Sequence, residues 1–350
     1  MKKVNERGPI SPVEKRRMIY GMGLAALIAV TAWFGVGLVF LRTHADVSAP
    51  QARTDDAYTG QWIIEPAREA NGLHLTLMYS SEKRGRGQNM NSFNISPDQL
   101  RGLTSAQVMS AGTNVQFQLA RDAGTFNCEG WFKGGRGSGT YVFASSAAFV
   151  AELKRRSYDA PTEAQLFRLA MSDTGLALLD ELQAQGYDRP TLDQLVRMGD
   201  HGVRVEYVRA LKAQGYAVQS VDLLVRMVDH GVTIDFIKEL EALGYKQLPV
   251  ETLVRTVDHG VTPDYVRDLA ALGHRDLPLE QLTRLVDHGV NVRFIKEIEA
   301  AGYGHPPLDQ LVRMQDHGVN ARFIEKMKAR GFNNLTIDEL IKMADHGLND

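Results

Sequence analysis

The chain has 350 residues, of which 44% are hydrophobic and 23% are charged. This length exceeds one ordinary domain, and the composition is that of a globular protein, which excludes a disordered or fibrous chain. The formal net charge is only −2, and acidic and basic residues are interleaved. Because no basic stripe stands out, nucleic acid is excluded as a partner.

The N-terminal part has the pattern of a membrane anchor. Residues 1–17 are basic, and residues 18–41 form a run of 24 residues without a charge. As a helix this run would measure about 36 Å, enough to cross a hydrocarbon core of about 30 Å. The positive-inside rule then places the N-terminus in the cytoplasm and the bulk of the chain outside, in the periplasm or the extracellular space.

A cleaved signal peptide is the alternative interpretation of this segment. Its apolar core would be longer than the usual stretch of about 7 to 15 residues, and Arg42 stands where a small-residue cleavage site is expected. We therefore expect an uncleaved, single-pass signal-anchor helix at 18–41. Residues 42–57 are small, polar and aperiodic, which is typical of a linker.

Between residues 58 and 150 the periodicity changes to two, which predicts a small antiparallel β domain. Turn residues at 121–124 and 133–137 predict two hairpins, and Pro97 predicts a short helical turn. The expected strands include residues 62–64, 73–79, 115–119, 126–132 and 140–143.

Few residues of the β domain indicate chemistry. The only cysteine, Cys128, excludes an internal disulfide, and we expect it to be a small buried apolar residue. The glycine-rich run at 134–139 is interpreted as a hairpin loop, because no helix with a Lys-Ser or Lys-Thr pair follows it. The basic loop with Lys83, Arg84 and Arg86 is either a solvated tip or a contact for an anionic surface or glycan.

The C-terminal part repeats itself with a period of 29 residues, which predicts an α-helical solenoid over 151–350. Each copy begins with a Gly, except for a degenerate first copy that begins with Ser157. The copies start at 157, 186, 215, 244, 273, 302 and 331.

Each copy reads as two short helices. The first opens at an N-cap such as Thr191, Ser220 or Thr336, or at a Pro such as Pro249, and closes at Asp-His-Gly. The second opens at Thr233, Thr262, Asn291 or Asn320 in successive copies and ends at the next copy's Gly. Such a pair cannot bury its apolar face alone, so the copies must stack and share a core, and we expect a broad concave binding face.

The recurring Asp-His pair is the candidate site of the repeats. A shared metal is not expected, because packed helices lie about 8–10 Å apart whereas zinc ligands lie about 2 Å from the ion. We expect a structural role instead, in which the His bonds free carbonyls at the helix end and the Asp pairs with a basic residue three positions earlier; pairing across copies stays open. The pairs are Asp200-His201, Asp229-His230, Asp258-His259, Asp287-His288, Asp316-His317 and Asp345-His346.

Three segments carry a resemblance to a known group of proteins. Residues 230–237 (HGVTIDFI), 259–266 (HGVTPDYV) and 121–132 (RDAGTFNCEGWF) resemble the region appended to BlaR1-like (M56-type) antirepressor membrane proteins of bacteria. The likeness covers about residues 58–350 and implies an extracytoplasmic β domain with helical repeats. BlaR1-type proteins carry several membrane spans and a His-Glu-x-x-His zinc peptidase, and this chain has one apolar span and no such motif. The resemblance therefore implies no peptidase activity.

Taken together, these patterns predict an α+β multi-domain binding protein without enzyme activity, cofactor or metal. The leading hypothesis is a protein of the bacterial cytoplasmic membrane that binds another envelope protein, within a sensing or regulatory system. The alternative is that the β domain binds a ligand or cell-wall glycan and the solenoid transmits occupancy. Trp62, Trp131 and the basic loop would then be the ligand contacts, clustered around one open pocket.

Overall fold

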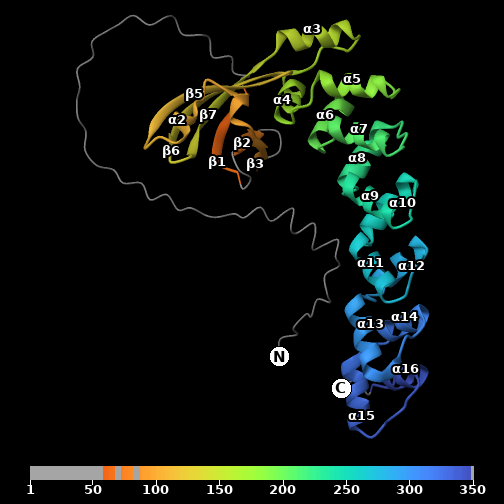
Figure 1. Ribbon diagram of the computed structural model, residues 1–350. Coiled ribbons are helices and arrows are strands. Elements are labelled where there is room, and N and C mark those ends of the chain that lie inside the picture. The colour runs from red at the N-terminus through yellow and green to blue at the C-terminus, as the bar shows by residue number, and fades with distance from the viewer. Residues whose placement is uncertain (1–57, 68–71, 82–86, 348–350) are drawn as a thin grey trace, which may run out of the picture. The chain divides into compact units, whose positions relative to one another are not determined.

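A computed structural model describes residues 58–67, 72–81 and 87–347 of the chain (Figure 1). The protein is α+β, because an antiparallel sheet is followed by a long series of short helices. Two compact units divide within helix α8 (Val221–Asp229), one ending at Val225 and the other beginning at Arg226. The expected membrane span 18–41 and linker 42–57 lie outside the described residues. Among the residues that are described, no helix combines the length and apolar character needed to cross a membrane.

The sheet has seven strands in the order β3-β2-β1-β7-β6-β5-β4, and all neighbouring strands are antiparallel. The 3-10 turn η2 (Pro97–Gln99), which was expected from Pro97, and the short helix α2 (Ser105–Val108) flank strand β4. The strands are β1 (Thr59–Pro66), β2 (Leu73–Ser81), β3 (Gly87–Ile95), β4 (Leu100–Arg101), β5 (Thr113–Arg121), β6 (Gly124–Lys133) and β7 (Arg136–Ser145).

Both predicted hairpins are confirmed. Arg121 pairs with Gly124, and Lys133 pairs with Arg136, so each hairpin turns over two residues. In the second turn Gly134 and Gly135 have φ values of 58° and 84°. A two-residue turn of this kind needs positive φ at both positions, which explains the two glycines.

Strand β3 is not predicted by the sequence pattern. Its residues are mainly Gly, Asn, Gln and Ser, which have low β propensity. The strand nevertheless pairs with β2 at nine successive positions, from Leu73 opposite Ile95 to Ser81 opposite Gly87. Pairing with an existing apolar strand has therefore overridden local preference.

The sheet is curled (Figure 1). Alternate residues of each strand point to the same face, and the apolar residues on one face are buried. Trp62 lies at its centre with no exposed surface, between the rings of Phe117 and Phe132 at centroid distances of 5.0 and 5.6 Å. Its indole Nε1 donates to the carbonyl oxygens of Glu129 and Thr140, each at 3.1 Å. One buried side chain thus ties β1 to both β6 and β7.

Helix α4 (Glu163–Met171) joins the helical repeats to the sheet through one aromatic side chain. Phe167 is 1% exposed and contacts the rings of Tyr58, Tyr79 and Phe143 at centroid distances of 4.5, 5.0 and 5.4 Å. Burying a Phe side chain of this kind stabilises a fold by about 1.5–3 kcal/mol. The sheet and the first helices therefore behave as one folded unit.

Polar contacts complete this joint. Arg121, at the end of β5, donates from Nη1 to Asp173 at 2.5 Å, and burial lowers the pKa of its guanidinium. Asp122 accepts the backbone N–H of Leu176 at 2.8 Å, at the start of α5 (Leu176–Ala184). A carboxylate at a helix N-terminus satisfies free N–H groups and favours the helix dipole.

The helices keep the 29-residue period of the sequence. Helices α3 (Ala147–Arg155) and α4 stand one period before α5 and α6 (Leu192–Asp200), so the series begins at Ala147, ahead of the expected boundary at 151. The later elements are α7 (Val205–Ala213), α8, α9 (Ile234–Ala242), α10 (Val250–Asp258), α11 (Pro263–Ala271), α12 (Leu279–Asp287), α13 (Val292–Ile298), η3 (Glu299–Tyr303), α14 (Leu308–Asp316), α15 (Ala321–Ala329) and α16 (Ile337–Asp345).

The ends of these helices follow the expected capping residues. At N-caps the side chain accepts an N–H three residues on, and each such cap stabilises its helix by about 1 kcal/mol. The helices end at left-handed positions that favour Gly, and the degenerate copy fills these with Ser157 at φ 62° and Asp173 at φ 52°. The confirmed N-caps are Thr191, Thr233, Thr262, Asn291, Asn320 and Thr336.

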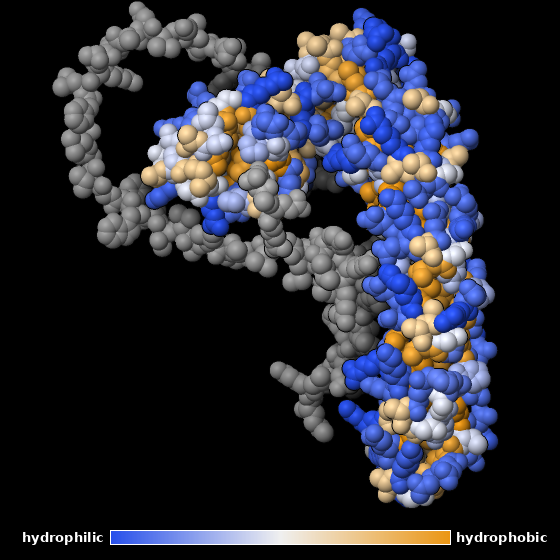
Figure 2. All heavy atoms as spheres, viewed as in Figure 1, coloured by the Kyte–Doolittle hydropathy of each residue, from blue (hydrophilic) through white to orange (hydrophobic). Residues whose placement is uncertain are grey.

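In the unit that begins at Arg226, alternate helices form two rows (Figure 1). Helices α9, α11, α13 and α15 follow one another in one row, and α10, α12, α14 and α16 form the other. A continuous apolar cluster from Val261 to Ala344 fills the space between them. Figure 2 shows hydrophobic atoms in the seams between helices and hydrophilic atoms over most of the visible helical surface. The copies thus share one core, as expected of stacked repeats.

Candidate functional site

The candidate site of the repeats lies where the helices of one row end. Helix α10 ends at Asp258, and His259 is its C-cap residue, with a backbone N–H that donates to Arg255 O at 3.0 Å. Gly260 follows at φ 74°, and Val261 N–H reaches back to Thr256 O at 3.0 Å. This closing turn explains why a Gly follows each Asp-His pair, because Gly readily adopts the left-handed conformation that ends the helix there.

The histidines form a ladder across copies, which we call the His-Asp ladder. Each ring donates from Nδ1 to Oδ1 of the Asp that lies 28 residues later, at the equivalent helix end of the next copy. The pairs are His230 with Asp258 at 2.6 Å, His259 with Asp287 at 2.7 Å, His288 with Asp316 at 2.5 Å and His317 with Asp345 at 2.6 Å.

The expected pairing inside each copy is therefore wrong for these residues. The Asp accepts from a His of the preceding copy. Arg226, Arg284 and Arg313, which were expected to pair with it, each reach an acid in the next copy instead. Arg226 donates to Glu251 at 2.6 Å, and Arg284 donates to Asp309 at 2.8 Å. The reason is geometric, since equivalent groups of stacked copies come close together while the Arg and Asp of one helix are directed to different neighbours.

The ends of the series differ from its middle. At the end of α16, His346 donates from Nδ1 to the carbonyl of Lys342 at 2.6 Å, as expected for a helix end. Asp200 pairs with Arg168 of the preceding copy. His201 and Asp229 occupy equivalent positions at the ends of α6 and α8.

The ladder has limited chemistry of its own. Its His side chains are about one third exposed, with relative exposures of 36–39%. An Asp-His pair orients an imidazole, but a catalytic centre also needs a nucleophile or a bound water in a protected site. Within the described part of the chain, no three His, Cys, Asp or Glu residues come close enough to hold a metal ion. The ladder is thus suited to joining copies and to presenting equivalent polar groups.

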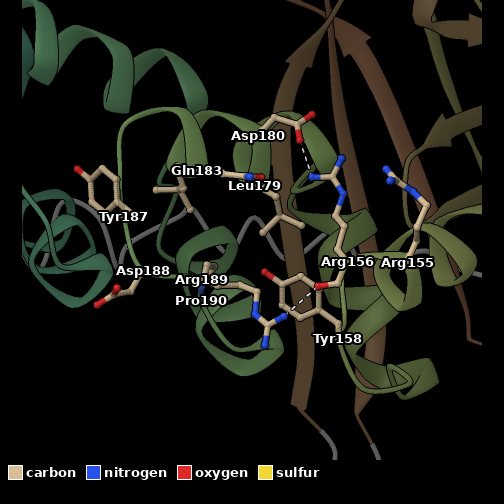
Figure 3. Close-up of a pocket in the computed structure, with 11 residues that line it drawn as sticks. Arg155, Arg156, Tyr158, Leu179, Asp180, Gln183, Tyr187, Asp188, Arg189 and Pro190 are labelled. Atoms are coloured by element: carbon tan, nitrogen blue, oxygen red, sulfur yellow. Dashed lines mark hydrogen bonds and ion pairs between the residues drawn. The ribbon is translucent and has the colours of Figure 1, made fainter.

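A second candidate is a hollow of about 580 Å³ between α3, α5 and the following loop (Figure 3). Its cationic groups are already engaged. Arg156 donates to Asp180 at 2.5 Å, and Arg189 donates to the carbonyl of Arg156 at 2.9 Å with its guanidinium 5.2 Å from the ring centre of Tyr158. Since Arg156 and Arg189 already bind groups of the protein itself, the hollow is better explained as a packed junction between the first copies.

The expected ligand contacts of the β domain are not brought together. Trp62 is fully buried, whereas Trp131 is 51% exposed on the opposite face of the sheet. The expected pocket around both tryptophans is therefore wrong, because strand alternation separates them. Lys83, Arg84 and Arg86 lie outside the described residues.

Cys128 is buried, as predicted, and burial raises the pKa of its thiol to about 12. Such a thiol stays protonated at neutral pH and has no nucleophilic role.

The sequence pattern did not point to the amide and hydroxyl side chains around Trp131, on β5, β6 and β7. Their alternation with buried residues was a visible signal, but no single motif marks them.

Comparisons of this chain with protein families, with curated proteins and with solved structures gave no match.

Proposed function

We propose that this chain is a membrane-anchored binding protein whose helical repeats hold a protein partner. The observation that carries the proposal is the His-Asp ladder, in which a partly exposed imidazole recurs once in every copy between residues 230 and 345. A hydrogen bond fixes each ring, so equivalent groups are presented with little loss of side-chain freedom on binding.

The spacing of the ladder suits an extended partner. Packed helices lie about 8–10 Å apart, and three residues of an extended chain span about 10 Å. A peptide or strand would therefore place every third residue opposite a new copy. Such a partner would gain affinity from each copy that it crosses, so several weak contacts would add up.

The anchor is proposed from the sequence. Residues 18–41 hold the chain in the bacterial cytoplasmic membrane, with the N-terminus in the cytoplasm and residues 58–350 outside it. The support is the uncharged run and the basic residues before it. A reporter enzyme that is active only outside the cytoplasm, fused after residue 350, is expected to be active; an inactive fusion of intact length would contradict this orientation.

The resemblance to the BlaR1-like appended region supports a place in an envelope sensing or regulatory system. Neither a peptidase nor another catalytic role belongs to the proposal. The chain would serve as the binding component, and its partner would be another envelope protein.

The binding surface is tested by site-specific photocrosslinking of the full chain in cells. A photoreactive residue replaces Arg255, which is exposed one turn before the ladder residue His259, or Lys238, which is exposed on a helix of the other row. We expect a defined crosslinked protein from position 255 and none from 238, and we expect it to weaken in a His259→Ala, His288→Ala variant. Identical products from both positions, or a product unaffected by the ladder variant, would refute the proposal.

A further inference from the structure

Nine outward-facing side chains form a small lattice on β5, β6 and β7, which we call the amide face. They are mainly amides and hydroxyls, with one carboxylate, one indole and one valine, and they form three rows that cross the three strands. The rows are Asn114-Trp131-Ser138, Gln116-Glu129-Thr140 and Gln118-Asn127-Val142. Rows lie about 7 Å apart along the strands, and neighbouring strands lie about 4.8 Å apart.

The amide face is hollowed along its length. A hollow of about 720 Å³ lies around Trp131, and another of about 590 Å³ lies around Asn127. The two share the middle row, Gln116, Glu129 and Thr140, so they form one continuous shallow groove. Helix α2 borders the first hollow and strand β4 borders the second, through Gln107 and Arg101. On the β5 side the groove is therefore bordered by two further polar side chains.

The middle row has a hydrogen-bonded backbone and outward side chains that are open to a ligand. Trp62 donates to the carbonyl oxygens of Glu129 and Thr140, which fixes the backbone of both residues. The exposed side chains of Gln116, Glu129 and Thr140 make no hydrogen bond to any other described residue. Only in the third row do two side chains pair, where Gln118 donates to Asn127 at 2.7 Å. The groove thus offers unoccupied side-chain donors and acceptors on a hydrogen-bonded backbone.

The charge of the face narrows the class of ligand. Glu129 and Arg101 are the charged residues among those lining the two hollows, so they balance. Nucleic acid or another polyanion would need several Lys or Arg side chains. A protein interface normally has an apolar centre, whereas here the exposed apolar side chains lie at the two ends, Trp131 with Ile63 beyond Ser138 at one end and Val142 at the other. The ligand should therefore be uncharged and rich in hydroxyl groups.

We propose that the amide face binds a neutral oligosaccharide. A sugar ring has an apolar face of C–H groups, which stacks on a flat indole such as the half-exposed Trp131, and a rim of hydroxyls. Each hydroxyl both donates and accepts a hydrogen bond, and a Gln or Asn side chain provides one acceptor and two donors side by side. Glu129 accepts from two neighbouring hydroxyls in the middle of the groove. This site is separate from the protein-binding ladder and does not depend on it.

The experiment measures binding of the purified full chain, in detergent micelles, to an array of neutral and of acidic oligosaccharides. The strongest neutral binder is then titrated by calorimetry. Trp131→Ala is expected to weaken binding at least about tenfold, as for an aromatic anchor, and Trp131→Phe should restore part of it. Gln116→Ala should weaken binding about threefold to tenfold. Phe332→Ala, which removes a 47% exposed aromatic from the repeats, is the matched control and should bind normally.

Three results would overturn the proposal. The first is that no neutral oligosaccharide on the array binds. The second is that acidic oligosaccharides bind instead and that binding disappears with salt, which would indicate nonspecific charge attraction. The third is that Trp131→Ala binds as well as the unaltered chain while its circular dichroism is unchanged, which would place the sugar elsewhere. If Trp131→Ala instead abolished a protein crosslink in cells and no sugar bound, the face would be a protein interface.

Discussion

The sheet and the repeats are stabilised in different ways. In the sheet, single residues make contacts that occur once, as Trp62 does when it bonds to two strands, stacks on Phe132 and meets Phe117 edge to face. In the repeats, the same bond recurs from copy to copy, as the His-Asp ladder does. Loss of one contact should therefore damage a whole unit in the sheet, whereas in the repeats the damage should be small, local and additive.

The largest effect is expected at the joint between the sheet and α4. Phe167→Ala removes a buried ring that contacts Tyr58, Tyr79 and Phe143. We expect the free energy of unfolding of the sheet-containing unit to fall by about 3–5 kcal/mol, measured by urea denaturation with tryptophan fluorescence. Phe332→Ala, at an exposed position, should change it by less than about 0.5 kcal/mol. Equal effects of the two substitutions would contradict the described packing.

The repeats should tolerate the loss of one hydrogen bond of the His-Asp ladder. Asp287→Ala removes the acceptor of His259, and the cost should be about 1 kcal/mol, the net value of one hydrogen bond. Asp345→Ala removes the acceptor of His317, two copies further on, so the two costs should add. Urea denaturation followed by far-ultraviolet circular dichroism measures both. If the loss of one such bond lowered the free energy of unfolding by several kcal/mol, the His-Asp bonds would not be independent of one another.

One copy lacks a bond that its neighbours make. Tyr245 and Tyr303 donate to the carbonyls of Leu277 and Leu335, at 2.6 and 2.9 Å, in each case 32 residues later. His274 occupies the equivalent position, and its buried Nε2 has no partner among the described residues. His274→Tyr should restore the bond, to the carbonyl of Pro306, and raise the free energy of unfolding by about 1 kcal/mol. A destabilised variant would show that this copy packs differently.

The smallest effect is expected from a surface carboxylate. Hydrogen bonds from Arg155 and then Arg156 lower the pKa of Glu152 from 4.5 to about 2. Because the folded pKa is lowered, the ionised group stabilises the fold above pH 4.5, and this contribution disappears as the pH falls toward 2. Glu152→Gln should therefore lower Tm slightly at neutral pH and leave it unchanged near pH 2. A difference that grows on acidification would contradict the assigned pairing.

Local signals predicted the local features of this fold. Capping residues such as Thr233 and Asn320 predicted helix starts, and paired glycines predicted the hairpin at Gly134 and Gly135. Strand β3 was missed because pairing with β2, and not its own composition, makes it a strand. The His and Asp residues of the ladder were assigned the wrong hydrogen-bond partners, because each His bonds to an Asp 28 residues further along the chain. A sequence shows that His and Asp recur, but only stacking decides which copies supply each pair.

The same limit applied to the β domain. Trp62 and Trp131 were grouped by residue type, yet strand alternation places one inside and one outside. The amide face became visible only when the register set Gln116, Glu129 and Thr140 in one row.

The most direct test of the central claim, that the repeats are interchangeable steps of one binding array, is deletion of one copy. Removing residues 244–272 takes out 29 residues and should bring His230 opposite Asp287, which is the next Asp in register. We predict a folded, cooperative protein with less helix, by circular dichroism and urea denaturation. Removing 22 residues, 244–265, should disrupt the array because the register is broken. If the 29-residue deletion unfolds the chain as thoroughly as the 22-residue deletion, the repeats are not equivalent steps and the central claim is wrong.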